Sequence, residues 1–478
     1  MVNQVIHFVF GVVLARLLSP TEYGIIGMSM VFITFSEAIV NSGLEQALIR
    51  KQDCTEDDYN TMFYTNIGLG IVMFALLYFA AGAIARFYNN SELILVVRIM
   101  SLNLVINSFG IVERAILTRN IDFKRQTKIN VWSSSISGLI GVSMAFMGFG
   151  YWSLAIKMIS QNLIRVLLLH LSSVWKPTLS YSVSAFKELF SFGSRMLGSS
   201  ILHSIYTNIY SLVIGKYFSA AELGFYSRAN QFKNLVSSNI ESSTQRVTYP
   251  ILSQIVDDEE RVRTAYRKLI KLTFYISAIM LSLMLINAKE IVLILLGNKW
   301  SQSIPYLQIL CLAGVLYPVR LINANVIKAK GRADLYLRVE VIRRIVCIPA
   351  IIVGVMLGMK ALLWAMVFNS VLEYMANSLY SNKLLNYTIS EQLLDILPTI
   401  LCVPVMSAFS MTVGSLLTSN IIMSLMIKTF LFFSFVYISG RLLKTYEFWE
   451  IRTIIQEQIA SILPIWLRER LRDIKSGQ

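Results

Sequence analysis

Apolar runs of about twenty residues recur along the whole chain, and they limit its fold more than any other feature. Thr65–Ala85 is a full example, and Leu272–Asn287 and Ile348–Leu357 are the most apolar parts of longer segments. Strands of a membrane barrel would instead alternate apolar and polar residues over about ten positions. The runs therefore predict an all-α polytopic membrane protein.

Composition agrees with this prediction and excludes several classes of site. Only 15% of the residues are charged, against about 25% in soluble domains, and 55% are hydrophobic. The net charge of +15 comes from Lys and Arg in the short links between apolar runs, so it does not predict nucleic-acid binding. The cysteines and histidines are scattered, which predicts no disulfide framework, metal site or cofactor: Cys54, Cys311, Cys347, Cys402, His7, His170 and His203.

Apolar runs and polar breaks together predict about fourteen transmembrane spans. They lie near residues 1–18, 23–48, 62–86, 92–112, 129–148, 151–174, 192–214, 222–250, 268–296, 302–327, 335–357, 361–381, 393–417 and 421–442.

The positive charges of the links alternate from one side of the predicted membrane to the other. The odd-numbered links carry only Arg86, Lys216, Lys299 and Lys360. The even-numbered links carry Arg50, Lys51, Arg114, Arg119, Lys124, Arg125, Lys128, Lys176, Lys187, Arg261, Arg263, Arg267, Lys268, Lys271, Lys328, Lys330, Arg332 and Lys383. The positive-inside rule then predicts that both termini are cytoplasmic.

Part of the chain is repeated at an offset of 200 positions. Ala15-Arg-Leu-Leu-Ser-Pro-Thr-Glu-Tyr-Gly24 recurs as Gly215-Lys-Tyr-Phe-Ser-Ala-Ala-Glu-Leu-Gly224. The first and seventh spans cross in the same direction, so the two six-helix bundles are predicted to be parallel repeats.

Met1 corresponds to Ile201, inside the seventh span, so we expect about ten to twenty residues to be missing at the front, in a fragment or through a misassigned start.

The repeat predicts the domain organisation. Residues 1–174 form an N-terminal six-helix bundle with a shortened first helix, and 192–385 form the C-terminal six-helix bundle. Residues 175–191 are a cytoplasmic linker with an amphipathic helix, and 386–444 supply helices 13 and 14. Residues 445–478 place Ile451, Ile455, Ile459, Leu463 and Leu467 at helical spacing beside Arg468, Arg470 and Arg472, which predicts an amphipathic tail on the inner membrane surface.

Polar residues within the spans indicate where a substrate would pass. A charge at the bilayer centre costs about 2.5–3.5 kcal/mol on insertion scales, so such residues face a partner or water. Span 2 carries a stripe of Thr34, Glu37, Asn41 and Glu45, and span 8 carries one of Gln231, Asn234, Ser238, Glu241, Ser242 and Gln245. Internal pairing explains many single residues, as for Glu340 with Arg343 and Arg344, but two polar helices at equivalent positions predict a shared cavity.

Several short stretches are distinctive in their order and spacing. They are Ala15-Arg-Leu-Leu-Ser-Pro20, Arg119-Asn-Ile-Asp-Phe-Lys124, Trp175-Lys-Pro177, Phe190-Ser-Phe-Gly193, Gly215-Lys216, Leu223-Gly-Phe-Tyr-Ser-Arg-Ala229, Arg246-Val-Thr-Tyr-Pro-Ile-Leu-Ser253, Gly297-Asn-Lys-Trp300 and Lys330-Gly-Arg332. Together they resemble the polysaccharide-transporter branch of the multidrug/oligosaccharidyl-lipid/polysaccharide superfamily, the Wzx-type oligosaccharide flippases. The resemblance runs from about residue 5 to about residue 340.

The resemblance implies a non-enzymatic transporter in the bacterial inner membrane that works by alternating access. Its substrate would be an undecaprenyl-diphosphate-linked oligosaccharide, moved from the cytoplasmic to the periplasmic leaflet for lipopolysaccharide, capsule or exopolysaccharide synthesis. The family's cationic cavity role is carried to Arg16, Arg228 and Arg246, which lie in matched stretches.

Further cavity and coupling residues are predicted from their place inside spans. Lys157, Arg165, Arg195 and Lys233 are the additional cations. Coupling to H⁺ or Na⁺ would fall to Glu37, Glu45, Glu241 or Glu373, because a buried carboxylate can exchange protons. Polymerase and glycan-assembly proteins are expected as further partners.

Other functions stay open at this point. A multidrug–cation antiporter of the same superfamily would need fewer basic residues in its cavity. A membrane polymerase or ligase acting on the same lipid would need a large outward loop, whereas the links Gly148–Tyr151 and Thr418–Asn420 are short. A passive scaffold for glycan assembly would leave the polar stripes unexplained.

Overall fold

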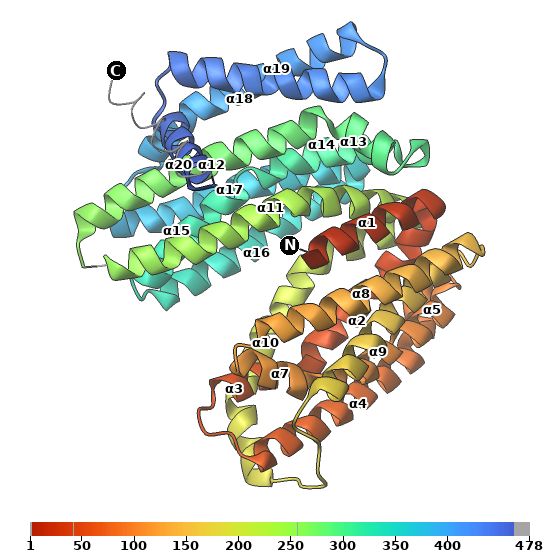
Figure 1. Cartoon of the computed structure of the whole chain (residues 1–478). Coiled ribbons are helices and arrows are strands. Elements are labelled where there is room, and N and C mark those ends of the chain that lie inside the picture. Colours follow the sequence, from red (N-terminus) through yellow and green to blue (C-terminus); the bar gives the residue numbers. More distant parts are fainter. Residues whose placement is uncertain (1, 42, 256, 463–478) are drawn as a thin grey trace. The chain divides into compact units, whose positions relative to one another are not determined.

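The computed structural model describes residues 2–41, 43–255 and 257–462, with only the backbone described at 195, 333, 455 and 457–462. This described part of the chain consists of helices and short connections, without strands (Figure 1). The predicted all-α fold class is confirmed. The chain divides into a first unit, Met1–Arg228 with Leu295–Ser303, and a second unit, Ala229–Ile294 with Ile304–Gln478.

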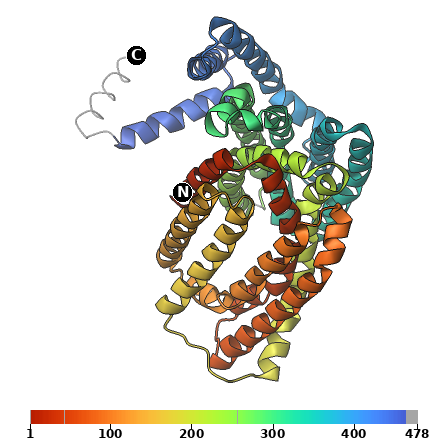
Figure 2. The same cartoon turned by 90° about the vertical axis from the view of Figure 1, so that its right-hand side faces the viewer.

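The first unit contains ten helices within the described residues, and part of an eleventh. They are α1 (Val2–Leu17), α2 (Pro20–Asn41), α3 (Leu44–Arg50), α4 (Glu56–Tyr88), α5 (Leu93–Met100), α6 (Leu102–Ser108), α7 (Ile111–Arg119), α8 (Phe123–Phe146), α9 (Trp152–Ser172), α10 (Val183–Tyr217) and the start of α11 (Ala220–Gln254). Helix α8 packs between α1 and α9, and α10 packs along α2, α3 and α4 (Figure 2).

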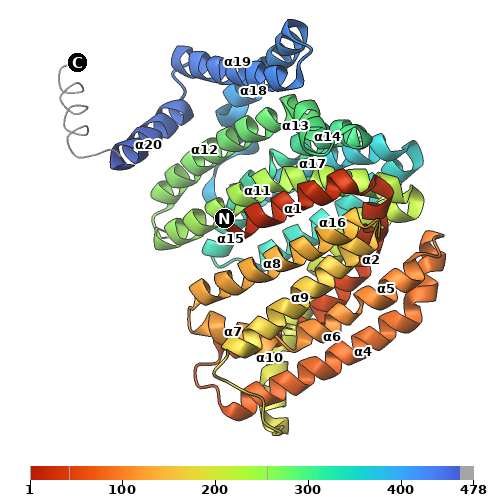
Figure 3. The same ribbon diagram turned by 45° about the vertical axis from the view of Figure 1, so that its right-hand side comes forward.

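The second unit begins within α11 and continues to the end of the chain. Its remaining elements are α12 (Glu259–Ile286), α13 (Ala288–Leu295), α14 (Ser303–Gly314), α15 (Tyr317–Ala329), α16 (Ala333–Leu357), α17 (Met359–Leu385), α18 (Ile389–Leu417), α19 (Ile421–Leu442) and α20 (Tyr446–Ile462). Helices α16 and α17 form one antiparallel pair and α18 and α19 another (Figure 3). Tyr266, Phe274 and Tyr387 belong to the core of buried side chains between α12, α15, α17 and α18.

Every predicted span falls on one or more helices, but the count of fourteen is not confirmed. Eight described helices are long and apolar enough to cross a membrane, or nine if the bent pair Leu93–Ser108 and Ile111–Arg119 is one span. Helices α10 and α11 are 35 residues long and rich in polar residues, which lowers their mean hydropathy. Many large apolar side chains on the helices are exposed, including Phe79, Met356 and Leu416, as expected of surfaces that face lipid.

The second half of the linker before the second repeat is helical and tied to the first repeat. Phe186–Gly193 forms early turns of α10, and Lys51 Nζ lies 2.9 Å from both Glu188 Oε2 and Asp58 Oδ1. Burial lowers the pKa of Lys51, but its hydrogen bonds to Glu188 and Asp58 outweigh burial and raise it. Lys51 therefore remains a cation that joins α10 to the start of α4.

The two copies of the repeat begin their second helices with the same local structure. Ser19 precedes α2, and its hydroxyl accepts a hydrogen bond from the amide of Glu22 at 3.4 Å. Ser219 precedes α11 and accepts from the amide of Glu222 at 3.1 Å. A serine at the N-cap followed by glutamate three residues later is a capping pattern, so the repeated Ser and Glu have a shared structural reason.

Gly24 and Gly224 are required by a close crossing of these two helix starts. A Cβ at Gly24 would lie 1.7 Å from the carbonyl oxygen of Ala220, and one at Gly224 would lie 1.9 Å from that of Pro20. The contact is reciprocal at the offset of 200, so equivalent residues of the two copies meet each other. No side chain fits between these backbones.

Trp300 completes the structure around this crossing. Its side chain is fully buried, and its Nε1 donates a hydrogen bond of 2.8 Å to the carbonyl oxygen of Ala15 near the end of α1. The ring packs edge-on against Tyr23 and Phe225, at centroid distances of 5.4 and 6.1 Å. The Gly297–Trp300 stretch thus caps the end of α1 and covers both helix starts.

We predict that Gly24→Ala and Gly224→Ala each destabilise the protein by about 1–3 kcal/mol, the range for overpacking a filled site. The matched control is Gly68→Ala in α4, where a Cβ meets nothing within 4 Å. That change is expected to leave stability unchanged or raise it, because alanine favours helix over glycine. Thermal unfolding followed by size-exclusion chromatography measures all three, and equal melting temperatures for Gly24→Ala and Gly68→Ala would contradict the crossing.

Candidate functional site

Polar side chains of α9 face α1 and α8 inside the first unit. Lys157, Gln161 and Arg165 are four residues apart, so they share one face of α9. Gln161 Nε2 donates to Ser134 Oγ on α8 at 3.2 Å, and Ser134 Oγ lies 3.1 Å from His7 Nε2 on α1. The charges of Lys157 and Arg165 act on His7, which places both cations along this interface.

Arg228 extends the same polar region from the start of α11. Its guanidinium lies over the ring of Tyr23 at 3.8 Å from the centroid. The charge of Arg228 also acts on Lys157. Two like charges at this proximity repel each other in a poorly hydrated environment, and an anion between them would relieve the repulsion.

Two acids of the stripe predicted on span 2, Glu37 and Glu45, also lie close to this polar region. Arg114 on α7 forms two hydrogen bonds with Glu45 on α3, from Nε to Oε1 at 2.9 Å and from Nη2 to Oε2 at 2.8 Å. The charges of Arg165 and Arg114 both act on Glu37. We call the set Glu37, Glu45, Arg114, Lys157, Arg165 and Arg228 the polar seam; four cations face two carboxylates.

The structure brings only some of the predicted site residues into the polar seam. Arg16 is exposed at the end of α1, where its Nε donates to the carbonyl oxygen of Leu295 at 2.8 Å. Arg246 is exposed on α11, and the side chain of Arg195 lies outside the described part of the chain. Lys233 belongs to the second unit, where the charge of Glu241 acts on it.

The remaining predicted acids of the second unit have close partners. Glu241 Oε1 accepts a hydrogen bond from the Tyr317 hydroxyl at 3.3 Å. Glu373 pairs with Arg320 and accepts from Asn369 Nδ2 at 2.9 Å. The internal pairing of Glu340 is present as well, with Arg343 at 2.8 Å and Arg344 at 3.9 Å.

Sequence reasoning missed three charged residues that the structure makes important. Arg114 was assigned only to a link, yet it bridges to Glu45. Arg320 and Lys428 lie within apolar runs, and they pair with Glu373 and Glu290; Lys428 Nζ lies 2.6 Å from Glu290 Oε1. A search for single charges inside apolar runs would have found both cations.

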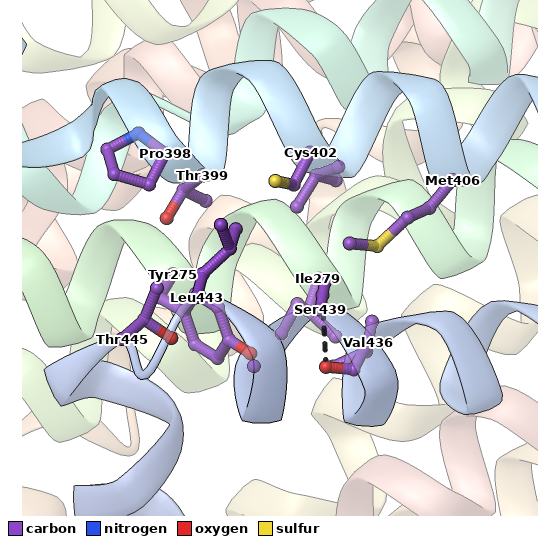
Figure 4. Close-up of a pocket in the computed structure, with 12 residues that line it drawn as sticks. Tyr275, Ile279, Pro398, Thr399, Cys402, Met406, Val436, Ser439, Leu443 and Thr445 are labelled. Atoms are coloured by element: carbon purple, nitrogen blue, oxygen red, sulfur yellow. Dashed lines mark hydrogen bonds between the residues drawn. The ribbon is translucent and has the colours of Figure 1, made fainter.

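One cavity of the second unit, between α12, α18 and α19, is too small to bind a large anion. It holds about 20 Å³ and is lined by Tyr275, Cys402 and Met406 among others (Figure 4). That volume has room for about one water molecule. Among residues 2–41, 43–255 and 257–462 there is no cluster of three or more His, Cys, Asp or Glu side chains placed to hold a metal.

Comparison with known proteins places this chain in a family. The sequence model for the family described as polysaccharide biosynthesis protein matches residues 13–305, more than half of the chain.

Three curated relatives are similar over most of their length. The succinoglycan biosynthesis transport protein ExoT of Rhizobium meliloti is 27% identical over 77% of this chain and 74% of its own. The teichuronic acid biosynthesis protein TuaB of Bacillus subtilis is 27% identical, covering 70% and 68%. The lipopolysaccharide biosynthesis protein WzxC of Escherichia coli is 26% identical, covering 72% and 70%.

Solved structures share the fold. The lipid II flippase MurJ, in an inward closed conformation, aligns with a TM-score of 0.71 at 14% identity, over 92% of this chain and 97% of its own. An inward-facing multidrug resistance transporter of the MATE family aligns with a TM-score of 0.63 at 16% identity, over 80% and 94%. The helical arrangement is therefore that of known transporters.

We predict that Arg114→Ala and Glu45→Ala each destabilise the protein by about 1–3 kcal/mol, because each leaves a half-buried charge without its partner. The double variant is expected to cost less than the sum of the two. Asp334→Asn is the control, since the Arg332–Asp334 pair is about half exposed and water screens it. Additive effects on the melting temperature would show that Arg114 and Glu45 do not act as a pair.

Proposed function

Because this chain belongs to the family of polysaccharide biosynthesis proteins, we propose that it flips lipid-linked anionic oligosaccharides between the leaflets of a bacterial inner membrane. The names of relatives support a glycan cargo: ExoT is named for transport in succinoglycan biosynthesis, and TuaB and WzxC for teichuronic acid and lipopolysaccharide biosynthesis. The fold of MurJ, named as a lipid II flippase, suits movement of such a lipid.

The excess of cations in the polar seam is the observation that carries this proposal. Lys157, Arg165 and Arg228 lie inside the first unit, where placing several like charges together is costly. Guanidinium groups match phosphate oxygens in geometry and charge, so a diphosphate would bind where these side chains converge. The same excess argues against a cation antiporter, whose binding site would need a surplus of carboxylates.

The transport cycle follows from alternating access. The seam captures the diphosphate and its sugars from the cytoplasmic side, while the undecaprenyl chain stays in the bilayer. A change of conformation then exposes the cargo to the periplasm, and glycan-assembly proteins such as a polymerase receive it. Both termini lie in the cytoplasm, in accord with the alternation of positive charge in the links.

Glu37 is the acid best suited to couple this cycle to H⁺ or Na⁺. Glu45 is held by two hydrogen bonds from Arg114, and Glu373 by Arg320 and Asn369. Glu37 has neither a hydrogen bond nor an ion pair to a described residue, although the charges of Arg165 and Arg114 act on it. A carboxylate without fixed partners can bind and release a cation with little rearrangement.

We predict that Arg165→Ala, Lys157→Ala and Arg228→Ala each reduce flipping at least about tenfold, the effect of losing one hydrogen bond to a charged group. The assay is the appearance of lipid-linked oligosaccharide in the outer leaflet of proteoliposomes. Lys360→Ala is the control, because Lys360 is exposed and outside the polar seam. Full flipping by all three seam variants, with normal melting temperatures, would refute the cationic site.

We predict that Glu37→Gln abolishes the response of flipping to a pH or Na⁺ gradient while the melting temperature stays near that of the wild type. Glu45→Gln should instead lower the melting temperature, because it breaks the pairing with Arg114. Flipping driven by an imposed gradient in proteoliposomes distinguishes the two variants. A gradient response retained in Glu37→Gln would assign coupling to another acid.

A further inference from the structure

A second cavity of about 290 Å³ lies at one end of the first unit, apart from the polar seam. Four helix ends surround it: the start of α4, the ends of α7 and α9, and the start of α8. The segment Ser173–Trp175 closes one side. Because these helices are candidate membrane spans or parts of a bent one, we expect their ends near the lipid headgroups.

The lining of this cavity combines carboxylates with aromatic rings. Glu56 Oε2 accepts a hydrogen bond from Trp175 Nε1 at 2.9 Å, and the rings of Trp175 and Tyr59 are 6.0 Å apart. Asp122 Oδ1 caps α8 by accepting from the amide of Arg125 at 3.0 Å. Carboxylates beside aromatic faces form a site that favours an ammonium group.

Glu113 adds a buried carboxyl group to the same wall. Its side chain is 1% exposed, and His170 Nδ1 lies 2.5 Å from Oε1. The other oxygen, Oε2, accepts no hydrogen bond of ordinary geometry from the described residues. A buried carboxylate in this state is a strong acceptor, so it increases the preference of the cavity for a cation that carries N–H donors.

Arg125 is the cation that lines the cavity, and it gives the cavity a second recognition element. Arg119, which approaches from the end of α7, is held by Gln52 and by the Tyr59 hydroxyl at 3.2 Å. Arg125, unlike Arg119, lines the cavity beside the carboxylates, and its guanidinium group can bind a phosphate there. The cavity can therefore bind a ligand whose headgroup carries both an ammonium group and a phosphate group.

Apolar side chains around the cavity are exposed to an unusual degree. Val174 is 95% exposed and Leu171 83%, and Ile121 and Phe123 on either side of Asp122 are 73% and 54% exposed. In a chain that spans a membrane, such side chains at helix ends are suited to contact with lipid chains. The mouth of the cavity therefore meets the acyl region as well as the headgroups.

We propose that this cavity binds the headgroup of an aminophospholipid, with the ammonium at Glu56, Asp122 and Glu113 and the phosphate at Arg125. Exposed apolar side chains around Val174 hold the acyl chains. The lipid is a bound constituent of the membrane rather than cargo, because the polar seam is cationic while this cavity carries three carboxylates and one arginine. The proposal stands independently of what the polar seam transports.

Native mass spectrometry of the full, delipidated chain tests the proposal directly. Dioleoyl phosphatidylethanolamine, phosphatidylcholine and phosphatidylglycerol are titrated separately, and the first bound lipid is counted. We expect phosphatidylethanolamine to bind about tenfold more tightly than phosphatidylcholine, whose methylated nitrogen cannot donate hydrogen bonds to carboxylates. The double variant Glu56→Gln/Asp122→Asn should lose this preference, and Arg125→Ala should weaken both lipids.

Two further variants keep the result interpretable. Trp175→Phe keeps the ring but removes the donor to Glu56, so it should reduce the preference without loss of folding. Asp334→Asn, in an exposed pair of the second unit, should leave lipid binding unchanged. Equal binding of phosphatidylcholine, tighter binding of phosphatidylglycerol, or a preference that survives in the double variant would each overturn the proposal. None of these outcomes depends on flipping.

Discussion

The cost of placing a charge inside a membrane organises this structure. An unpaired charge there costs several kcal/mol, so each one within the helices needs a partner or a polar surrounding. Glu290 with Lys428 and Glu373 with Arg320 are closed pairs, because in each a carboxylate oxygen contacts a nitrogen of the cation. The polar seam differs, because beside the closed Arg114–Glu45 pair it holds three more cations and one more carboxylate. Its charge is therefore not balanced within the set, as it is in the closed pairs.

The sequence predicted the helical positions well, because apolar runs and capping residues are local signals. The recurrence of Ser19, Glu22 and Gly24 at 219, 222 and 224 also correctly indicated equivalent structure in the two copies. The number of membrane spans was harder to predict, because α10 and α11 are long helices with many polar residues. Local patterns therefore located helices more reliably than they assigned each helix to the membrane.

Pairings between distant charges could not be predicted from these patterns. Arg320 lies within an apolar run whose average hides a single charge, and its partner Glu373 lies on another helix. Arg114 was counted among the charges of a link, although a helix carries it to Glu45. Lys157 and Arg165 were predicted as cations inside a span, and their helical spacing alone places them on one face of α9. Their convergence with Arg228 required the tertiary structure.

The hydrogen bond from Trp300 to the carbonyl oxygen of Ala15 has a consequence for biosynthesis. The first unit includes Leu295–Ser303, so the residues that finish the end of α1 are synthesised after α11 and α12. A nascent chain that has reached Arg228 lacks the indole that fills the space between Tyr23 and Phe225. The first unit therefore remains incompletely packed until α11, α12 and α13 have been synthesised.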